Sequence, residues 1–218
     1  MNDILLIDKP KGITSFDVIR ILRRKLNIRK MGHAGTLDPL GSGLMIIGIE
    51  KGTKKLNDYL KLPKIYIAEV LLGKKTTTGD MEGEVLEEKK IPEIDIKIIE
   101  KIIKELKGKI TLPVPIYSAI KIKGKALYEY ARKEIDIKPP EKEMEIIKIK
   151  LNNYYKDEDF YVLCLEIEVA SGTYIRSIAE EIGRRLNYPA TLRNLRRTKI
   201  GNFKIEDAQK LDLTLWKF

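Results

Sequence analysis

One short segment of the chain carries a carboxylate in a setting that suits chemistry. Residues 31–43, MGHAGTLDPLGSG, hold four Gly and one Pro, with Asp38 near the middle. This composition predicts a loop rather than a regular element. A loop carboxylate can act as a nucleophile or as a general acid or base. The alternative is structural: Asp38 before Pro39 also fits the first residues of a helix with Asp38 as its N-cap, and residue statistics alone favour that alternative.

Missing motifs exclude several other chemistries. The chain contains neither GxxxxGK[ST] nor GxGxxG, so nothing supports nucleotide hydrolysis or a Rossmann cofactor. One histidine, His33, and one cysteine, Cys164, are too few for the common zinc sites or for an internal disulfide. His33 also lies only five residues before Asp38, which is cramped for a Ser-His-Asp triad. We therefore expect no metal and no cofactor.

Six further motifs follow the order of a known family. They are DKPKGITS at 8–15, KIY at 64–66, TGDMEG at 78–83, PIYSAIK at 115–121 with Gly124, GTYIR at 172–176 and LRR at 195–197. Together with the Asp38 loop they resemble bacterial TruB-type tRNA pseudouridine synthases over nearly the whole chain. The resemblance implies the pseudouridine synthase fold and isomerisation of uridine 55 in the T-arm of tRNA, with the base flipped out of the RNA and no cofactor.

The resemblance also assigns three catalytic roles. It makes Asp38 the catalytic carboxylate, and Arg176 the partner that keeps this carboxylate ionised and oriented. It makes Tyr66 the aromatic that stacks on the target base and is a candidate for proton transfer. Without the family, Arg176 would be interpreted as a helix-surface arginine near Glu180 and Glu181, and Tyr66 as a core residue of an alternating strand.

Further positions match the family's RNA contacts. By resemblance, Tyr174 and Leu195 line the base pocket, and His33 fills the gap left by the flipped nucleotide. Asp80 supports the site, whereas residues 9–12 brace the catalytic loop and offer lysines, Lys9 among them, to phosphate. The alternatives are a core role for Leu195, a surface role for His33 and an Asx turn at Asp80.

Positive charge is concentrated in two segments. The net charge is +10; residues 1–64 hold 13 basic and 6 acidic side chains, and residues 171–204 hold 8 and 2. This pattern predicts one positive face for a polyanion such as RNA, although a Lys-rich surface that serves solvation is the alternative. Six of the 11 arginines lie in 176–197. We therefore expect Arg193, Arg196 and Arg197 to contact RNA.

The order of predicted elements favours an α+β fold with a mixed, largely antiparallel sheet flanked by helices. Strands are expected at 4–7, 44–49, 65–72, 117–122, 143–154 and 160–170, a strand or loop at 191–200, and a hairpin arm at 84–88. Helices are expected at 16–26, capped by Ser15, and at 54–60, 95–107, 126–134 and 173–186.

The chain as a whole is interpreted as a single catalytic domain over residues 1–218. Relatives of the TruB type usually continue into a C-terminal PUA domain, and we expect that domain to be absent because about a dozen residues follow Ile205. No run of 18 apolar residues and no signal peptide is found. We expect a cytoplasmic monomer that binds the T-arm of tRNA and no membrane.

Overall fold

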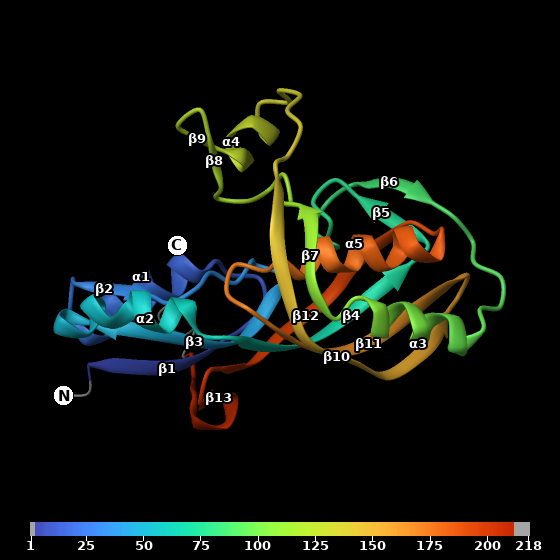
Figure 1. Ribbon diagram of the computed structural model, residues 1–218. Coiled ribbons are helices and arrows are strands. Elements are labelled where there is room, and N and C mark those ends of the chain that lie inside the picture. The colour runs from blue at the N-terminus through green and yellow to red at the C-terminus, as the bar shows by residue number, and fades with distance from the viewer. Residues whose placement is uncertain (1–2, 212–218) are drawn as a thin grey trace. The chain divides into compact units, whose positions relative to one another are not determined.

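The computed structural model describes residues 3–211 (Figure 1). They divide into two compact units: unit 1 holds the chain up to Ile67 and from Leu195 onward, and unit 2 holds Ala68–Asn194. Two strands, β4 (Lys64–Leu72) and β12 (Ala190–Ile200), contribute residues to both units. Most strand pairs are antiparallel and helices flank the strands, which confirms the α+β class with a mixed, largely antiparallel sheet.

Unit 1 is built around β3 (Gly41–Ile49), whose nine residues are all buried. This strand pairs antiparallel with β1 (Ile4–Lys9) and β2 (Met31–His33), and parallel with β12. A continuous apolar run of this kind is typical of a strand covered on both faces. The remaining elements of the unit are α1 (Ser15–Leu26), η1 (Glu50–Lys55), α2 (Leu56–Lys61), β13 (Phe203–Lys204), η2 (Ile205–Asp207) and β14 (Gln209–Lys210).

Unit 2 is built around the long antiparallel pair β10 (Glu141–Asp157) and β11 (Phe160–Val169), with β7 (Gly108–Pro113) against the first part of β10. Helix α5 (Ile175–Leu186) buries one full face, and α3 (Ile96–Glu105) buries Ile99 and Ile103. Smaller elements are β5 (Lys74–Thr76), β6 (Val85–Glu88), β8 (Lys121–Ile122), β9 (Lys125–Ala126) and α4 (Leu127–Ala131). The β5–β6 pair confirms the predicted hairpin.

Three local predictions were wrong. Of the strand expected at 117–122 only the two residues of β8 are a strand, and an unpredicted strand, β7, lies before it, where Ile110 and Leu112 alternate against β10 and Pro113 ends the strand. Residues 31–43 include β2 and the start of β3: Gly32, Gly41 and Gly43 lie in these strands, and only Gly35 lies in the irregular segment between them. The N-cap of α1 is Thr14, which forms a capping box with Asp17, whereas Ser15 bonds elsewhere.

Within residues 3–211, no helix is long and apolar enough to cross a membrane. In the same range no group of three or more His, Cys, Asp and Glu side chains is placed to hold a metal ion.

Candidate active site

Asp38 lies in an irregular segment between β2 and β3, in unit 1. Its carbonyl accepts a hydrogen bond from the Gly41 amide at 3.0 Å, which closes a β-turn with Pro39 at the second position. No helix follows Asp38, so the N-cap alternative is wrong. The turn leads straight into β3, and the buried strand therefore anchors one end of the loop.

The residues on both sides of Asp38 are tied to other elements of unit 1. The Ser15 hydroxyl, at the start of α1, accepts from the Leu37 amide at 2.8 Å and donates to the Leu37 carbonyl at 2.9 Å. On the other side the Gly12 amide donates to the Pro39 carbonyl at 2.9 Å. Because both neighbours are held, the backbone at Asp38 has a fixed path.

Two buried cations complete this bracing. Lys9 is 0 % exposed and donates to the carbonyls of Ile13 at 2.7 Å, Pro10 at 3.0 Å and Pro39 at 3.5 Å. Arg197, on β12, is 1 % exposed and donates to the carbonyls of Leu44, Gly35 and Thr36 at 2.7, 3.2 and 3.4 Å. The structure therefore gives both residues a bracing position in place of the expected phosphate contact.

Arg196 and Arg193 each form an ion pair with an aspartate of their own unit. The Arg196 guanidinium pairs with both carboxylate oxygens of Asp8, at 2.8 and 3.1 Å. Arg193, which belongs to unit 2, pairs with Asp157. The two side chains are 35 and 42 % exposed, so the expected contact of Arg193 and Arg196 with RNA stays a prediction.

Three other predicted residues lie in unit 1. Tyr66, on β4, and Leu195, on β12, are each 7 % exposed, and Leu195 pairs with Gly41 at the end of the Asp38 loop. His33 is half-buried at the end of β2. Burial and the nearby charge of Arg197 lower the pKa of His33, and its Nδ1 is buried without a hydrogen bond from any described residue.

Sequence analysis missed Lys64 as a site residue, although its motif was recognised. The side chain is 5 % exposed, and its ammonium donates to the carbonyls of Leu60 at 2.5 Å and Leu62 at 2.7 Å. Burial, reinforced by the charge of Arg197, lowers the pKa of Lys64 to about 8. A Cβ at Gly35 would lie 3.8 Å from Lys64 Cε, so Lys64 packs on the Asp38 loop.

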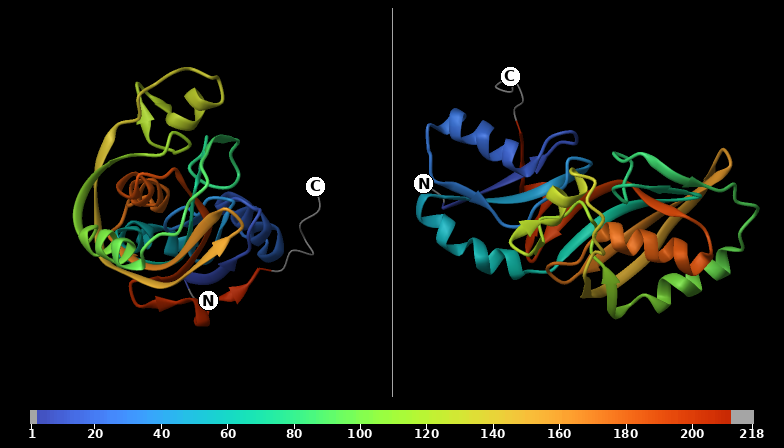
Figure 2. Two further views of the ribbon diagram at one scale, coloured as in Figure 1. Left: turned by 90° about the vertical axis from the view of Figure 1, so that its right-hand side faces the viewer. Right: turned by 90° about the horizontal axis from the view of Figure 1, so that it is seen from above.

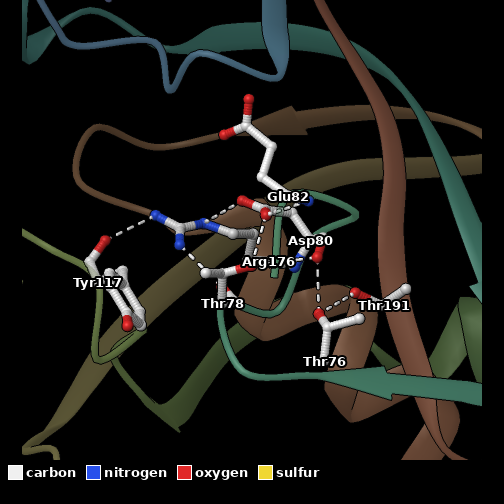
Figure 3. A network of polar contacts seen from close by, with 7 residues as sticks. All are labelled: Thr76, Thr78, Asp80, Glu82, Tyr117, Arg176 and Thr191. Atoms are coloured by element: carbon white, nitrogen blue, oxygen red, sulfur yellow. Dashed lines mark hydrogen bonds and ion pairs between the residues drawn. The ribbon is translucent and has the colours of Figure 1, made fainter. Parts of the chain in front are cut away.

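Unit 2 holds a cluster of polar contacts around Arg176, in the first turn of α5 (Figure 3). The side chain is only 6 % exposed, so the helix-surface alternative is wrong. Its guanidinium donates to the carbonyls of Thr78 at 2.9 Å and Tyr117 at 3.1 Å, and Nε lies 3.8 Å from Asp80 Oδ2. Glu181, which is near Arg176 in the sequence, pairs with Arg184 and Arg185 and not with Arg176.

Asp80 organises the loop that receives Arg176. Its Oδ1 accepts from the Thr78 hydroxyl at 2.6 Å and from the Glu82 amide at 3.1 Å, as in an Asx turn. Its carbonyl accepts from the Thr76 hydroxyl at 2.7 Å, which in turn contacts the Thr191 hydroxyl at 2.9 Å (Figure 3). The Asx turn given as the alternative for Asp80 is therefore present, and the same carboxylate also lies beside Arg176, while its role in supporting the site stays a prediction.

Tyr174 lies at the start of α5, beside this cluster in the sequence. It is half-buried, its amide donates to Met144 Sδ at 3.5 Å, and the Lys142 ammonium lies 5.7 Å from its ring centroid. An aromatic ring in contact with a cation offers one face to a planar ligand and one to a charge.

A cavity of about 440 Å³ also lies in unit 2, along α5. Its lining includes Glu180, Arg184 and Lys75, and burial raises the pKa of Glu180 although Lys75 and Arg176 oppose the rise. No residue predicted from the sequence as a site residue lines this cavity.

The family model and two curated relatives that match this chain all describe pseudouridine synthases. The model of the TruB family pseudouridylate synthase (N terminal domain) matches residues 23–175. A tRNA pseudouridine synthase B of Caldicellulosiruptor saccharolyticus is 46 % identical over 97 % of this chain and 72 % of its own length. That of Endomicrobium trichonymphae is 39 % identical over 95 % of this chain and 89 % of its own.

Two solved structures are similar in fold. A chain in the crystal structure of a Cbf5-Nop10-Gar1 complex gives a TM-score of 0.72 at 29 % identity, and one in an H/ACA RNP bound to a substrate RNA containing 2'-deoxyuridine gives 0.67 at 27 %. Each match covers 95 % of this chain. This chain spans about half of theirs, 52 % and 50 %.

Proposed function

Because the chain belongs to the TruB family of pseudouridylate synthases, which are isomerases, we propose that it converts uridine to pseudouridine in tRNA. We further propose uridine 55 of the T-arm as the target and Asp38 as the nucleophile. The relatives named tRNA pseudouridine synthase B support the substrate class. The fixed backbone on both sides of Asp38 is the observation that carries the catalytic role.

The reaction sets the demands on the site. The bond between N1 and C1′ breaks, the base turns over, C5 bonds to C1′, and the proton on C5 is exchanged for one on N1. No electrons are gained or lost, so no redox partner is needed. A positioned carboxylate can serve as nucleophile, and the gain from exact positioning is large because the reactants are held in a near-attack geometry.

The other predicted residues take the supporting roles. We propose that Arg176 orients the reacting carboxylate, since its buried guanidinium is already positioned by hydrogen bonds to the carbonyls of Thr78 and Tyr117. Tyr66 stacks on the target base and is the candidate for proton transfer. Tyr174 and Leu195 line the base pocket, and His33 fills the gap left by the flipped nucleotide. A stacked uridine is out of reach, so flipping is part of the mechanism.

The proposal also covers the domain content, the oligomeric state and the cellular location of the enzyme. We propose a single catalytic domain that acts as a monomer on tRNA in the cytoplasm. The relative in complex with a substrate RNA supports RNA as the ligand of this fold. A tRNA-folding role, in which the protein opens and releases the T-arm without chemistry, is the alternative that the experiment below separates.

The test uses an unmodified tRNA transcript carrying tritium at C5 of its uridines. The wild-type chain should release tritium and place pseudouridine at position 55, and Asp38→Asn should bind the transcript but release none. Asp58→Asn is the matched control, because Asp58 is exposed on α2, and it should keep the wild-type rate. Tritium release by Asp38→Asn at near the wild-type rate would refute the role of Asp38 as nucleophile. If the wild type binds the transcript but releases no tritium, only the tRNA-folding role remains.

A further inference from the structure

Helix α1 and the turn after it carry a group of exposed basic side chains in unit 1. Residues 14–30 contain six basic side chains and one acidic one. Arg20, Arg24 and Lys25 are exposed on α1, and Arg29 and Lys30 are exposed just beyond it. Arg20 pairs with Asp17, yet its side chain stays 62 % exposed, whereas Arg197 of β12 is buried. The positive face predicted from charge counting therefore has a different candidate location, on α1.

Phe16 gives this surface a defined geometry. Its side chain is 56 % exposed, and the guanidinium carbons of Arg20 and Arg23 lie 6.0 and 5.9 Å from its ring centroid. The three residues are spaced by four and three positions, so they share one face of the helix. An aromatic ring that contacts a guanidinium limits its rotation, and a pre-oriented fork loses less entropy when it binds an oxyanion.

This helix is bonded at both ends to the segment that carries Asp38. At its start, Ser15 holds Leu37, the residue before Asp38. Near its end, Arg23 donates to the Met31 carbonyl at 3.2 Å, at the start of the strand that leads to His33. In the right-hand view of Figure 2, α1 is the blue helix at the margin of unit 1. A strand of RNA that reaches the Asp38 loop thus has α1 beside it.

We propose that the outer face of α1 binds the phosphate backbone of the RNA substrate, next to the nucleotide that is isomerised. Arg20 and Arg24 supply the phosphate contacts, and Phe16 is a positioning residue that holds the guanidiniums of Arg20 and Arg23. The inference rests on the proposed function. The helix buries Val18, Ile19 and Leu22 in the unit and leaves only Phe16 and Leu26 of its large apolar side chains exposed, too few for an apolar stripe that would insert into a lipid surface.

The first test is the salt dependence of tRNA binding by the full chain. Each phosphate contact contributes about −0.7 to −0.9 to the slope of log affinity against log salt, so Arg20→Gln/Arg24→Gln should make the slope shallower by roughly 1.5. Lys101→Gln/Lys104→Gln is the matched control, since it removes two charges from the exposed side of α3 and should leave the slope unchanged. Thermal unfolding of all variants verifies that they are folded.

The second test isolates the role of Phe16 by a double-mutant cycle. Phe16→Ala should weaken tRNA binding in the wild-type background several-fold and have little effect in the Arg20→Gln/Arg24→Gln background, whereas Phe16→Tyr should restore binding. An equal loss in both backgrounds would mean that Phe16 contacts RNA by itself, and it would overturn the positioning role.

The outcomes separate this inference from the proposed function. If the wild type releases no tritium from tRNA, the proposed function fails whatever α1 does. If the wild type is active but the slope is the same for Arg20→Gln/Arg24→Gln and the α3 control, the phosphate-binding surface is refuted and the function stands. Suppose that Arg20→Gln/Arg24→Gln loses the binding to vesicles of anionic lipid that the wild type shows, but keeps the wild-type salt slope for tRNA. That result would also overturn the inference and assign α1 to a membrane surface.

Discussion

The Asp38 loop of unit 1 and the Arg176 cluster of unit 2 both use buried cations, for different purposes. Around Asp38 the cations come from outside the loop, from β1 and β12, and donate to carbonyls that set its path. In the other cluster the buried cation is Arg176, the side chain for which we propose a catalytic role, and the surrounding loop is ordered internally by Asp80 and its threonines. The first arrangement fixes a backbone; the second fixes one guanidinium.

This difference predicts how the two regions respond to substitution. Removing a brace from unit 1 should lower stability and turnover together, because the loop loses its path. Replacing Arg176 should lower turnover more than stability, because the loop around it has its own hydrogen bonds. The four predictions below test that contrast, from the largest expected effect to the smallest.

Arg197→Met should cause the largest loss of stability. The substitution leaves the carbonyls of Gly35, Thr36 and Leu44 without their guanidinium donor in a buried region, which should lower the free energy of unfolding by about 3 kcal/mol. Turnover of tRNA should fall as well. Urea unfolding and single-turnover kinetics measure the two effects.

The neighbouring Arg196→Met is the control. Arg196 has a side chain that is 42 % exposed and pairs with Asp8, so its loss should cost less than about 1 kcal/mol. Equal destabilisation by the two substitutions would contradict the bracing role of Arg197.

Arg176→Lys tests the same contrast in unit 2. Lysine keeps the charge but cannot donate to the carbonyls of Thr78 and Tyr117 in one plane. We expect turnover to fall on the order of 10²-fold through misplacement of reacting groups, with a smaller change in tRNA affinity and in the unfolding midpoint. Parallel losses of turnover and affinity would show that Arg176 only contacts RNA.

Local patterns predicted most of the fold, because they depend on neighbours in the sequence. The alternation of β4, the apolar run of β3 and the amphipathic α3 were all recognisable from spacing. The Asp38 segment was singled out by its glycines and by its family motif. Each of these signals lies within a few consecutive residues.

The failures involve contacts between distant residues. Arg196 and Arg197 look alike in the sequence, but successive residues of a strand point to opposite faces, so Arg197 is buried and Arg196 reaches Asp8. Ser15 was expected to cap α1, yet it bonds to Leu37, 22 residues away. Nothing local indicates which polar residue will find a distant partner.

Lys64 provides a pH-dependent test of the unit 1 cations. Its pKa is about 8 in the folded protein and 10.5 ordinarily, so between these values the unfolded chain binds more protons. The free energy of unfolding should therefore rise with pH across this window, by about 1–2 kcal/mol from pH 7.5 to 9.5, and the full cost of the buried charge is present below pH 8. Lys64→Met should abolish that rise, as measured by urea unfolding.

Lys54, which is exposed, supplies the control for that measurement. Lys54→Met should keep the wild-type rise between pH 7.5 and 9.5. A rise that persists unchanged in Lys64→Met would place its source in another group and would remove Lys64 from the set of buried cations.

The smallest expected effect is on His33, and it is the cleanest to observe because the chain has one histidine. Burial and the charge of Arg197 lower its pKa, so the ring-proton signals in a proton NMR titration should show a midpoint below 6.5. The stability that depends on His33 is intact above pH 6.5 and is lost as the pH falls through the folded-state pKa, because the unfolded chain then binds the proton more readily. Removing the charge in Arg197→Met should raise the midpoint by a few tenths of a pH unit, on the scale of a charge partly screened by solvent, whereas Arg196→Met should leave it in place. A midpoint at or above 6.5 in the wild type would mean that the loop is not the electropositive, buried setting that its cations indicate.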